Sequence, residues 1–506
     1  MNIKFFSLIT IIVAVGCKNI DSEIQKETSQ NKEIDSIKIV MDANVAPFLK
    51  DSSVTSISIG IYKNGKESIA HYGEMDPGKG NLPTNATLYE IASVTKTLTG
   101  TVAAQAVLDS KLNLDDDIRK YLKRKYKNLE YNGHPILIKH VLTHTSRLPS
   151  NNEGVDELFK NRDDSLFIKF NEIEKKLTKE KFYNYLQKIT LDTIPGTKYR
   201  YSNVGANLMA HILETVYEKP FISLLNEIVL DKAGMINTKM NLSEEESSVL
   251  VNGYDDQDNL MPHLPLGNTL WGADGGLKST MPDLVKYMKF QLESNDPAVN
   301  ESHKKLYQED PTEWIGYFWR IDENDEGIYY HHHGGSFGMN TYFFVYPEYD
   351  LGIAASTNSG GAKASSVLRE VVDGLLDDLK PFGKKSIMRA ISAKCYEDID
   401  AGIQYYYQLK AENIDTYNFS DENELNRLGY KFLRQGKIKE AIKIFTLLVE
   451  EFPEASNPYD SLGEAYFENK NYELSMINYK KSLKLNPQNE NALMMINRIN
   501  ELQEVK

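Results

Sequence analysis

Leu88-Tyr-Glu-Ile-Ala-Ser93-Val-Thr-Lys96-Thr-Leu-Thr-Gly-Thr-Val-Ala-Ala-Gln-Ala-Val-Leu108 is the stretch from which the fold and chemistry of this chain can be worked out. From Ser93 onward it contains small and apolar residues, and no charged residue follows Lys96 until Asp109. This pattern predicts a helix that is buried on all sides. A lysine one turn into such a helix would be largely desolvated, which lowers the pKa of its amine.

Ser93 and Lys96 have the spacing and surroundings of a nucleophile and its base. Residues three apart share one helix face, and a hydroxyl at the helix N-terminus lies where developing negative charge is favoured. A partly unprotonated lysine can activate an otherwise weak serine nucleophile. The Ser-x-x-Lys pattern also occurs at residues 29–32 and 302–305, in polar and charged surroundings. The pattern alone is therefore weak, and only the Ser93 copy opens an apolar helix.

Length, composition and charge limit the possible functions. The chain has 506 residues, 41% of them hydrophobic and 26% charged, as in globular proteins. Its length suggests about three structural units. The net charge is -14 and the isoelectric point is about 5.4. No partner nucleic acid is expected, because the chain lacks the basic surface that phosphates require.

The N-terminus has the features of an export signal. Lys4 precedes an apolar run, Phe5 to Val15, that is too short to span a bilayer and reads as a secretory signal. Residues 14–17, Ala-Val-Gly-Cys, resemble a bacterial lipoprotein processing box, although Ala14 stands where Leu, Val or Ile is usual. An uncleaved anchor or release at another site remains the alternative.

Cleavage at this box divides the N-terminal region in two. Residues 1–16 would be a lipoprotein signal peptide, Cys17 the lipidated first residue, and residues 17–35 a polar, flexible tether. The expected location is the bacterial cell envelope, facing the periplasm or the surface and attached to a membrane through the lipid. The other cysteine is Cys395, so a chain lipidated at Cys17 has no intramolecular disulfide.

Residues 36–380 show the pattern of an α+β domain. Two runs rich in β-branched and alternating residues, 56–62 and 67–72, flank the turn signal Asn64-Gly65 and predict a hairpin. The remaining expected elements are helices at 34–49, 204–214, 282–292 and 365–379, a helical insertion at 151–188, and strands at 314–321, 328–332, 340–346 and 351–357. This order predicts an antiparallel sheet flanked by helices, with a helical subdomain.

The C-terminal part contains an internal repeat. A shift of 34 residues aligns Gly429 with Gly463 and Phe445 with Tyr479. This period, with small and aromatic residues at matching places, resembles tetratricopeptide repeats. It predicts a small all-α repeat module at 421–506, preceded by a helical linker at 381–420. Because two repeats bury little core, the helix expected at 397–409 would cap them, or the array would dock on the first domain.

Three short strings follow one another in the chain, Ser93-x-x-Lys96, Tyr201-x-Asn203 and His332-x-Gly334. With their surroundings, they resemble the serine beta-lactamase and penicillin-binding fold, in the class C branch that also contains D-alanyl-D-alanine carboxypeptidases, peptidases and esterases. The resemblance covers roughly residues 40–380. It rests on residues 91–96 (Ile-Ala-Ser-Val-Thr-Lys), 141–149, 195–203, 275–280 (Gly-Gly-Leu-Lys-Ser-Thr) and 332–335 (His-His-Gly-Gly).

The resemblance implies a catalytic role for three residues. Ser93 would attack a carbonyl and become acylated, while Lys96 accepts its proton. Tyr201 would share the base duty and then protonate the leaving group, which requires that Lys96 lower the high pKa of the phenol. No cofactor or metal is expected.

The resemblance also implies the substrate-binding groups. Asn203 would hydrogen-bond the Lys96 ammonium or a substrate amide. The backbone N-H groups of Ser93 and Gly335 would form the oxyanion hole, and Gly334 and Gly335 would let their strand approach the substrate. A metal site at residues 331–333 is disfavoured, because successive strand residues point to opposite faces.

The sequence departs from the family pattern at two positions. His332 stands where beta-lactamases usually have lysine, and a largely neutral imidazole binds a carboxylate less well than an ammonium does. This favours the peptidase and esterase side of the family over true beta-lactamases. Arg147 replaces a usual glycine in residues 144–149, and we expect His144 and its neighbours there to be structural.

These residues together predict a lipid-anchored envelope serine hydrolase that forms a Ser93 acyl-enzyme on an amide or ester, with a repeat module that binds a protein partner. One alternative is a non-hydrolytic receptor that senses an acyl group or peptide and signals through its repeats. Another is that the repeats carry the main function. The substrate depends on walls at 150–195 and 250–275, which contain no readable residue code.

Overall fold

The computed structural model describes residues 36–49, 54–160, 166–266, 270–324, 326–504, and divides into two compact units, 1–380 and 381–506. The predicted signal peptide, Cys17 and most of the tether lie outside the described residues. Among the described helices, none has both the length and the apolar character needed to cross a membrane.

The first unit is built on an antiparallel sheet of eight strands. Its order is β2-β1-β14-β13-β12-β11-β10-β9, so the first hairpin joins the last strand of the unit. The predicted hairpin is confirmed, with Asn64 and Gly65 in left-handed conformation at its turn. The strands are β1 (Ser56–Lys63), β2 (Lys66–Gly73), β9 (Tyr307–Gln308), β10 (Glu313–Gly316), β11 (Trp319–Asn324), β12 (Gly327–Gly335), β13 (Asn340–Tyr346) and β14 (Leu351–Thr357).

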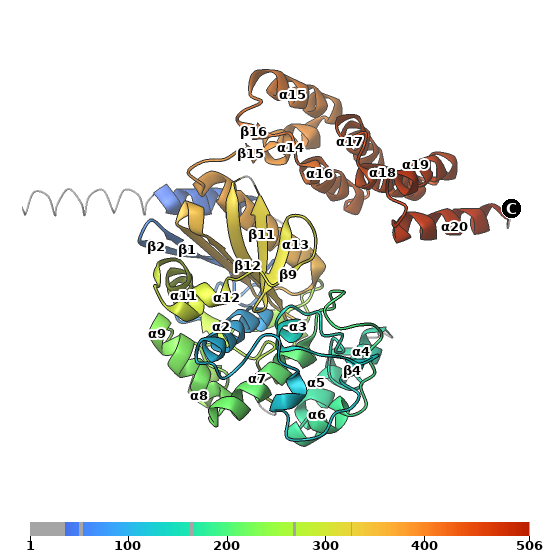
Figure 1. The fold of residues 1–506 in the computed structure, drawn as a ribbon. Helices are drawn as coiled ribbons and strands as arrows, with labels where there is room; N and C mark the ends of the chain where they lie inside the picture. Colours follow the sequence, from blue (N-terminus) through green and yellow to red (C-terminus); the bar gives the residue numbers. More distant parts are fainter. Residues whose placement is uncertain (1–35, 50–53, 161–165, 267–269, 325, 505–506) are drawn as a thin grey trace, which may run out of the picture. The chain divides into compact units, whose positions relative to one another are not determined.

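Helices cover both faces of this sheet (Figure 1). One face packs on α13 (Gly361–Leu379) and the helix at 36–49, through a core that includes Ile37, Ile59 and Leu368. The other face packs on α11 (Met281–Glu293), whose Val285 and Met281 contact β1 at Gly60. Alternate residues of β1 thus enter two separate cores, as the two-residue period of a strand requires.

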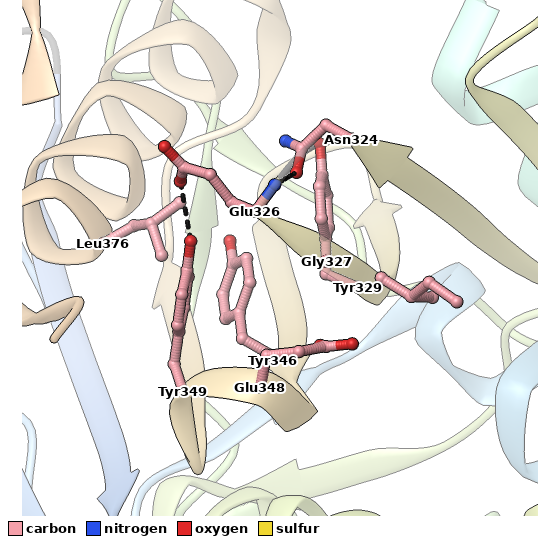
Figure 2. A pocket seen from close by; sticks show the side chains of 9 residues that line it. Asn324, Glu326, Gly327, Tyr329, Tyr346, Glu348, Tyr349 and Leu376 are labelled. Carbon is pink, nitrogen blue, oxygen red and sulfur yellow. Dashed lines mark hydrogen bonds between the residues drawn. The ribbon is translucent and has the colours of Figure 1, made fainter. Parts of the chain in front are cut away.

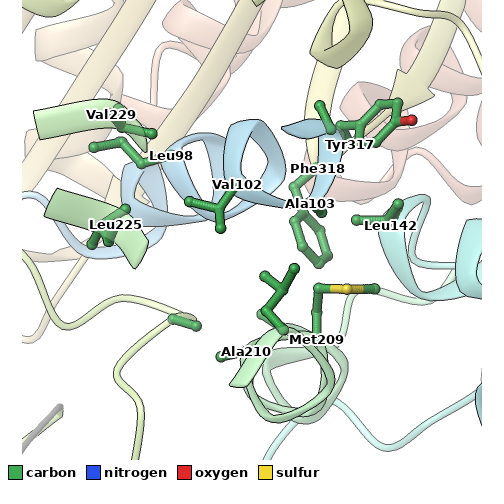
Figure 3. Packing of buried hydrophobic residues seen from close by; sticks show 14 of the residues in the cluster. Leu98, Val102, Ala103, Leu142, Met209, Ala210, Leu225, Val229, Tyr317 and Phe318 are labelled. Carbon is green, nitrogen blue, oxygen red and sulfur yellow. The ribbon is translucent and has the colours of Figure 1, made fainter. Parts of the chain in front are cut away.

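Helix α2 (Thr95–Leu108) lies in the larger core and is buried along nearly all its length. Figure 3 shows its Leu98 beside Val229 and its Ala103 near Phe318. The side of α2 that carries Ala103 also carries Gly100, and it lies so close to the turn after β10 that a Cβ added at Gly100 would be 1.9 Å from the Tyr317 carbonyl oxygen. This burial confirms the buried helix predicted from Ser93 onward, except that α2 begins at Thr95 and Ser93 lies in the one-turn helix Ala92–Val94 before it. The packing of α2 fixes the position of this Ser93 turn.

Shorter elements complete the unit and build the helical subdomain. The remaining strands are β3 (Leu88–Glu90), β4 (Glu130–Tyr131), β5 (His134–Pro135), β6 (Gly253–Tyr254), β7 (Leu260–Met261) and β8 (Lys278–Thr280). The remaining helices are η1 (Ala92–Val94), η2 (Ile118–Tyr121), α3 (Ile138–Leu142), α4 (Val155–Lys160), α5 (Leu166–Lys176), α6 (Lys179–Leu186), α7 (Asn203–Tyr217), α8 (Phe221–Leu225), η3 (Asn226–Leu230), α9 (Asp231–Ala233), α10 (Glu244–Ser247), α12 (Pro297–Ser302) and η4 (Pro347–Tyr349).

The prediction of a single strand at 314–321 is wrong. Two strands, β10 and β11, pair antiparallel there, with Trp314 opposite Ile321. The chain reverses at Tyr317 and Phe318, which both have positive φ, 50° and 68°. Aromatic residues rarely adopt this conformation, so the residue types gave no turn signal.

The second unit consists mainly of packed helix pairs. Its elements are β15 (Lys385–Ser386), α14 (Ile387–Glu397), α15 (Ile399–Glu412), β16 (Tyr417–Asn418), α16 (Glu422–Arg434), α17 (Ile438–Glu451), α18 (Ser456–Glu468), α19 (Tyr472–Leu485) and α20 (Glu490–Glu504). The repeat-equivalent glycines Gly429 and Gly463 lie against the rings of Phe445 and Tyr479. Residues 381–420, expected to be a helical linker, contribute α14 and α15 to the same core as α16 and α17.

Candidate active site

Ser93 lies in the one-turn helix η1, between the short strand β3 and helix α2. The turn is held by the backbone of Ile91, whose N-H donates to the Leu277 carbonyl oxygen. Ala92, directly before the serine, adopts a left-handed backbone with φ 43°. Such a conformation is costly for a residue with a Cβ and persists only where the surrounding structure enforces it.

The Lys96 side chain is fully buried, and its amine points back at the serine. Its Nζ donates to Ser93 Oγ at 3.0 Å and also to the backbone carbonyl oxygen of Asp274. Burial lowers the pKa of Lys96 to about 7, and the charge of Asp274 partly opposes this shift. At neutral pH, a substantial fraction of the amine is therefore unprotonated and able to accept the serine proton.

Tyr201 reaches the same oxygen from the loop before α7. Its hydroxyl donates to Ser93 Oγ at 2.6 Å, and the Lys96 Nζ lies 4.7 Å from the centre of its ring. Burial raises the pKa of Tyr201 above its ordinary value, although the Ser93 hydrogen bond opposes the rise. The lowered phenol pKa that a shared base duty requires is thus absent. The geometry instead suits a neutral phenol that donates a proton.

His144, next to the tyrosine, holds its loop in place. The Ser202 N-H donates to His144 Nδ1 at 3.1 Å, and the His144 ring lies 4.5 Å from the Tyr201 ring between centres. Burial lowers the pKa of His144 well below its usual value, so the imidazole is neutral. These contacts agree with the structural role expected for this residue.

Asn203 is the first residue of α7, and its side chain bonds to Asn151. Its amide nitrogen donates to Asn151 Oδ1 at 2.8 Å, whereas the hydrogen bonds of the Lys96 amine go to Ser93 and Asp274. The expected bond to the ammonium is therefore not formed. Asn203 lines a cavity beside Ser93, where it can meet a substrate amide.

The end of β12 lies directly against the serine turn. A Cβ added at Gly334 would be 2.1 Å from the Ile91 carbonyl oxygen and 3.1 Å from the Ser93 nitrogen. This close approach needs glycine. It brings Gly335, the next residue, into the lining of both cavities around Ser93.

The three consecutive histidines of β12 face different neighbours. His331 pairs with Asp322 at 2.9 Å, and His333 Nε2 lies 3.0 Å from Asn340 Oδ1. His332 is buried on the Tyr201 side, and its Nδ1 bonds to the His333 carbonyl oxygen at 2.8 Å. Because a carbonyl only accepts, this Nδ1 carries the proton. Burial and the nearby Lys96 lower the pKa of His332 well below its usual value, so the site presents a neutral imidazole.

Two cavities adjoin Ser93, with volumes of about 380 Å³ and 370 Å³. The first is lined by Ala92, Ser93, Asn151, Asn152, Phe159, Phe170, Glu174, Asn203, Leu264, Leu266, Asp274, Gly275, Gly335, Ser336 and Phe337. The second is lined by Ser93, His144, Tyr199, Tyr201, Ile315, Phe318, Arg320, His332, His333 and Gly335. Of the described residues, only Ser93 and Gly335 line both, so a substrate bound at these residues can extend into either cavity.

Several residues of these walls could not be identified from sequence. Asp274 supplies the carbonyl that holds Lys96, Glu174 enters the first cavity from α5, and Arg320 enters the second from β11. Arg320 is held by Glu313 at 3.0 Å. None of these three residues belongs to a recognisable motif. The Gly275-Gly276 pair after Asp274 is part of the string on which the family resemblance rests, but it does not mark Asp274 itself.

A third pocket lies away from this site, at the β11–β12 turn and η4 (Figure 2). Its volume is about 40 Å³, and it is lined in part by Tyr346, Glu348 and Leu376. The Tyr349 hydroxyl donates to Glu326 at 2.6 Å across it. This volume suits one or two water molecules, so the pocket is too small for an acyl substrate.

The fold and the site together define a serine hydrolase in which a lysine and a tyrosine flank the nucleophile. The beta-lactamase family profile matches residues 41–375, more than half of the chain, and the chain belongs to that family. A tetratricopeptide repeat profile matches residues 457–489. The family and fold class expected from the sequence are thereby confirmed.

Curated relatives support this membership. A beta-lactamase of Providencia stuartii is 24% identical over 355 residues, which cover 63% of this chain and 86% of the relative. The D-alanyl-D-alanine-carboxypeptidase/endopeptidase AmpH of Escherichia coli K12 is 26% identical over 245 residues, which cover 48% and 59%.

Solved structures share the fold. The beta-lactamase/D-alanine carboxypeptidase of Yersinia pestis, solved with citrate, superposes with a TM-score of 0.57 at 22% identity, covering 68% of this chain and 99% of its own. The corresponding protein of Pseudomonas syringae gives a TM-score of 0.58 at 18% identity, with coverages of 68% and 100%.

Proposed function

We propose that this protein hydrolyses an amide or ester in the cell envelope through an acyl-enzyme on Ser93, as a peptidase or esterase rather than a true beta-lactamase. The observation that carries the proposal is the pair of hydrogen bonds on the Ser93 oxygen, 3.0 Å from Lys96 Nζ and 2.6 Å from Tyr201. A hydroxyl between an amine that can be deprotonated and a neutral phenol is placed for acyl transfer, because the amine can accept its proton and the phenol can donate one to the leaving group.

The steps follow from the protonation states. The neutral Lys96 amine takes the Ser93 proton as Oγ attacks the carbonyl carbon, and the backbone N-H groups of Ser93 and Gly335 receive the oxyanion. The leaving group departs with a proton from Tyr201, which the Lys96 ammonium then reprotonates. Water then hydrolyses the Ser93 acyl-enzyme ester, with Lys96 and Tyr201 again transferring the protons.

The neutral His332 favours the peptidase or esterase assignment. Its Nδ1–H donates a hydrogen bond to the His333 carbonyl oxygen, and burial lowers its pKa so that the ring is uncharged. A substrate carboxylate gains less from this imidazole than from an ammonium in the same place. Relatives named carboxypeptidase/endopeptidase agree with an amide substrate.

A fluorophosphonate probe tests the nucleophile. We expect it to label the wild type and not Ser93→Ala. Ser302→Ala is the matched control, because it removes the buried hydroxyl of the other described Ser-x-x-Lys string, and it should label like the wild type. Equal labelling of Ser93→Ala and wild type would refute the acyl-enzyme.

Turnover separates the hydrolase from the receptor alternative. p-Nitrophenyl esters, D-alanyl dipeptides and a chromogenic cephalosporin should show repeated turnover on at least one ester or dipeptide, and slower hydrolysis of the cephalosporin. Stoichiometric acylation without turnover on every compound would favour a receptor that signals through its repeats.

A protein partner is expected at the repeats.

Lipid attachment at Cys17 would hold the enzyme at a membrane. The support is the lipoprotein-like box at residues 14–17. Cells grown with labelled palmitate should incorporate it into the wild type and not into Cys17→Ser. Equal incorporation by the two proteins would exclude this anchor.

A further inference from the structure

The two cavities beside Ser93 have different roles in the proposed reaction. Tyr201, the proton donor, lines the second cavity and not the first. The leaving group must receive its proton there, so the second cavity takes the leaving group. The first cavity, which shares Ser93 and Gly335 with it, then takes the acyl part of the substrate.

Two carboxyl groups line this acyl cavity. Glu174 and Asp274 both line it, and their side chains belong to residues only 5% and 6% exposed. Burial is the main cause that raises the pKa of Glu174, and the charge of nearby Asp274 adds to it; burial raises the pKa of Asp274 as well. The described lining residues of this cavity include no lysine, arginine or histidine. An acyl group with its own carboxylate would be repelled here, and a cation would be attracted.

Two buried oxygen atoms of the same cavity lack a hydrogen-bond donor. The Asn152 amide nitrogen donates to Glu174 Oε1 at 3.0 Å, which sets the orientation of the amide. Within the part of the chain that the structure describes, Asn152 Oδ1 and Asp274 Oδ1 are both buried and receive no hydrogen bond. Buried acceptors without donors are unfavourable. An ammonium group offers three donors and no acceptor, so its chemistry complements this lining.

Aromatic rings form another wall of the acyl cavity. Phe170 lies 6.3 Å from Phe159 and 4.8 Å from Phe337 between ring centres, both in edge-on arrangement. This contact joins α4 and α5 to the loop after β12. Faces of aromatic rings attract cations, and their area suits the carbon chain that carries one.

We propose that the acyl cavity selects substrates whose acyl part carries a free ammonium group at the end of a short carbon chain, as in an ω-aminoacyl ester or an ω-aminoacyl amide. Glu174 is the specificity-determining carboxylate, with Asn152 Oδ1 as a second acceptor. This inference rests on the proposed Ser93 acyl-enzyme. Burial raises the pKa of Glu174 to about 7, and a bound ammonium would favour its ionised form.

Two isosteric fluorophosphonates test this selectivity on the full-length protein, one with a 4-ammoniobutyl group on phosphorus and one with a pentyl group. In both reactions the Ser93 oxygen bonds to phosphorus, fluoride leaves, and the serine proton passes to Lys96. At pH 8 and constant ionic strength, the ammonium probe should label Ser93 at least about tenfold faster, the effect of one charged hydrogen bond. In Glu174→Gln the preference should fall to about threefold or less.

Glu172→Gln is the matched control, because Glu172 lies two residues away on α5 and is exposed; it should keep the wild-type preference. A competition assay needs no variant. Pentylammonium should slow labelling of the wild type by the pentyl probe, and hexanol at the same concentration should not.

The possible failures are distinguishable. Equal labelling by the two probes, or an unchanged preference in Glu174→Gln, overturns the ammonium selectivity and leaves the acyl-enzyme standing. If neither probe labels Ser93, the proposed function itself is overturned, and the selectivity with it.

Discussion

The charge balance around Lys96 is the feature of single residues that most directly controls the proposed chemistry. The amine is buried, which lowers its pKa to about 7, and Asp274 opposes that shift. Only the neutral amine accepts the serine proton. The rate should therefore be low below pH 7 and rise as the pH increases through about 7.

Asp274→Asn should move this rise to lower pH, because it removes the negative charge that favours the ammonium while retaining the backbone carbonyl that accepts from Lys96. The measurement is kcat/KM against pH on an ester substrate. Asp258→Asn, at an exposed position, should keep the wild-type profile. A rise in Asp274→Asn at the same or higher pH would contradict this assignment.

Residues of the site that are close in sequence could be predicted, and those brought together by the fold could not. Ser93 and Lys96 share a helix turn, so their spacing alone put them on one face. Asp274 and Arg320 come from distant segments, and their residue types are common on any surface. At Arg147 the sequence showed only a departure from glycine. Its φ of 64° explains why glycine suits this position, and its bond to Asp192 at 2.6 Å holds the arginine there.

At the scale of elements, the contact between β12 and η1 would determine the geometry of the oxyanion hole proposed for Ser93 and Gly335. The strand can approach the serine turn because Gly334 has no side chain. The end of β12, from Tyr330 to Gly335, is also paired with β13, so it cannot shift locally to make room. A change at residue 334 should therefore move the strand end as a whole.

Gly334→Ala should lower kcat by about a hundredfold, the effect of losing one oxyanion donor. Its Cβ would push the end of β12 away from the Ile91 backbone. Gly205→Ala in α7 is the control, because its Cβ would meet no atom closer than 3.4 Å. Steady-state kinetics and thermal melting of both variants test this, and wild-type kcat in a folded Gly334→Ala would refute it.

The elements themselves were predicted with unequal success. Strands β13 and β14 have the predicted bounds, because apolar residues, turn residues and strand length all agree there. The break between β10 and β11 was missed, since Tyr317 and Phe318 turn without glycine or asparagine. Packing of α2 against their backbone holds this turn, and a contact between distant segments leaves no local pattern.

At the scale of the whole molecule, the chain forms two units with separate cores. The first ends at Lys380 and contains Ser93, Lys96, Tyr201 and both cavities. The second has its own core, to which α14 and α15 contribute. The 34-residue period revealed its repeats. These two helices lie outside the period, and for the helix expected at 397–409 the sequence left open whether it caps the repeats or the array docks on the first domain.

Truncation after Lys380 should leave the hydrolase unit folded and reactive. The second-order rate of fluorophosphonate labelling at Ser93 should stay within about twofold of full length, because no residue beyond Lys380 belongs to the described site. Circular dichroism controls for folding. A folded truncation that labels more than tenfold slower would show that the repeats take part in catalysis.

The left-handed backbone of Ala92 creates a tension between heat tolerance and speed. Glycine at this position would relieve about 1–2 kcal/mol of strain, so laboratory evolution toward thermostability should favour it. The same substitution would widen the range of directions in which the neighbouring hydroxyl can point, and acyl transfer depends on a narrow one. Selection for durability and selection for turnover should therefore drive this codon in opposite directions.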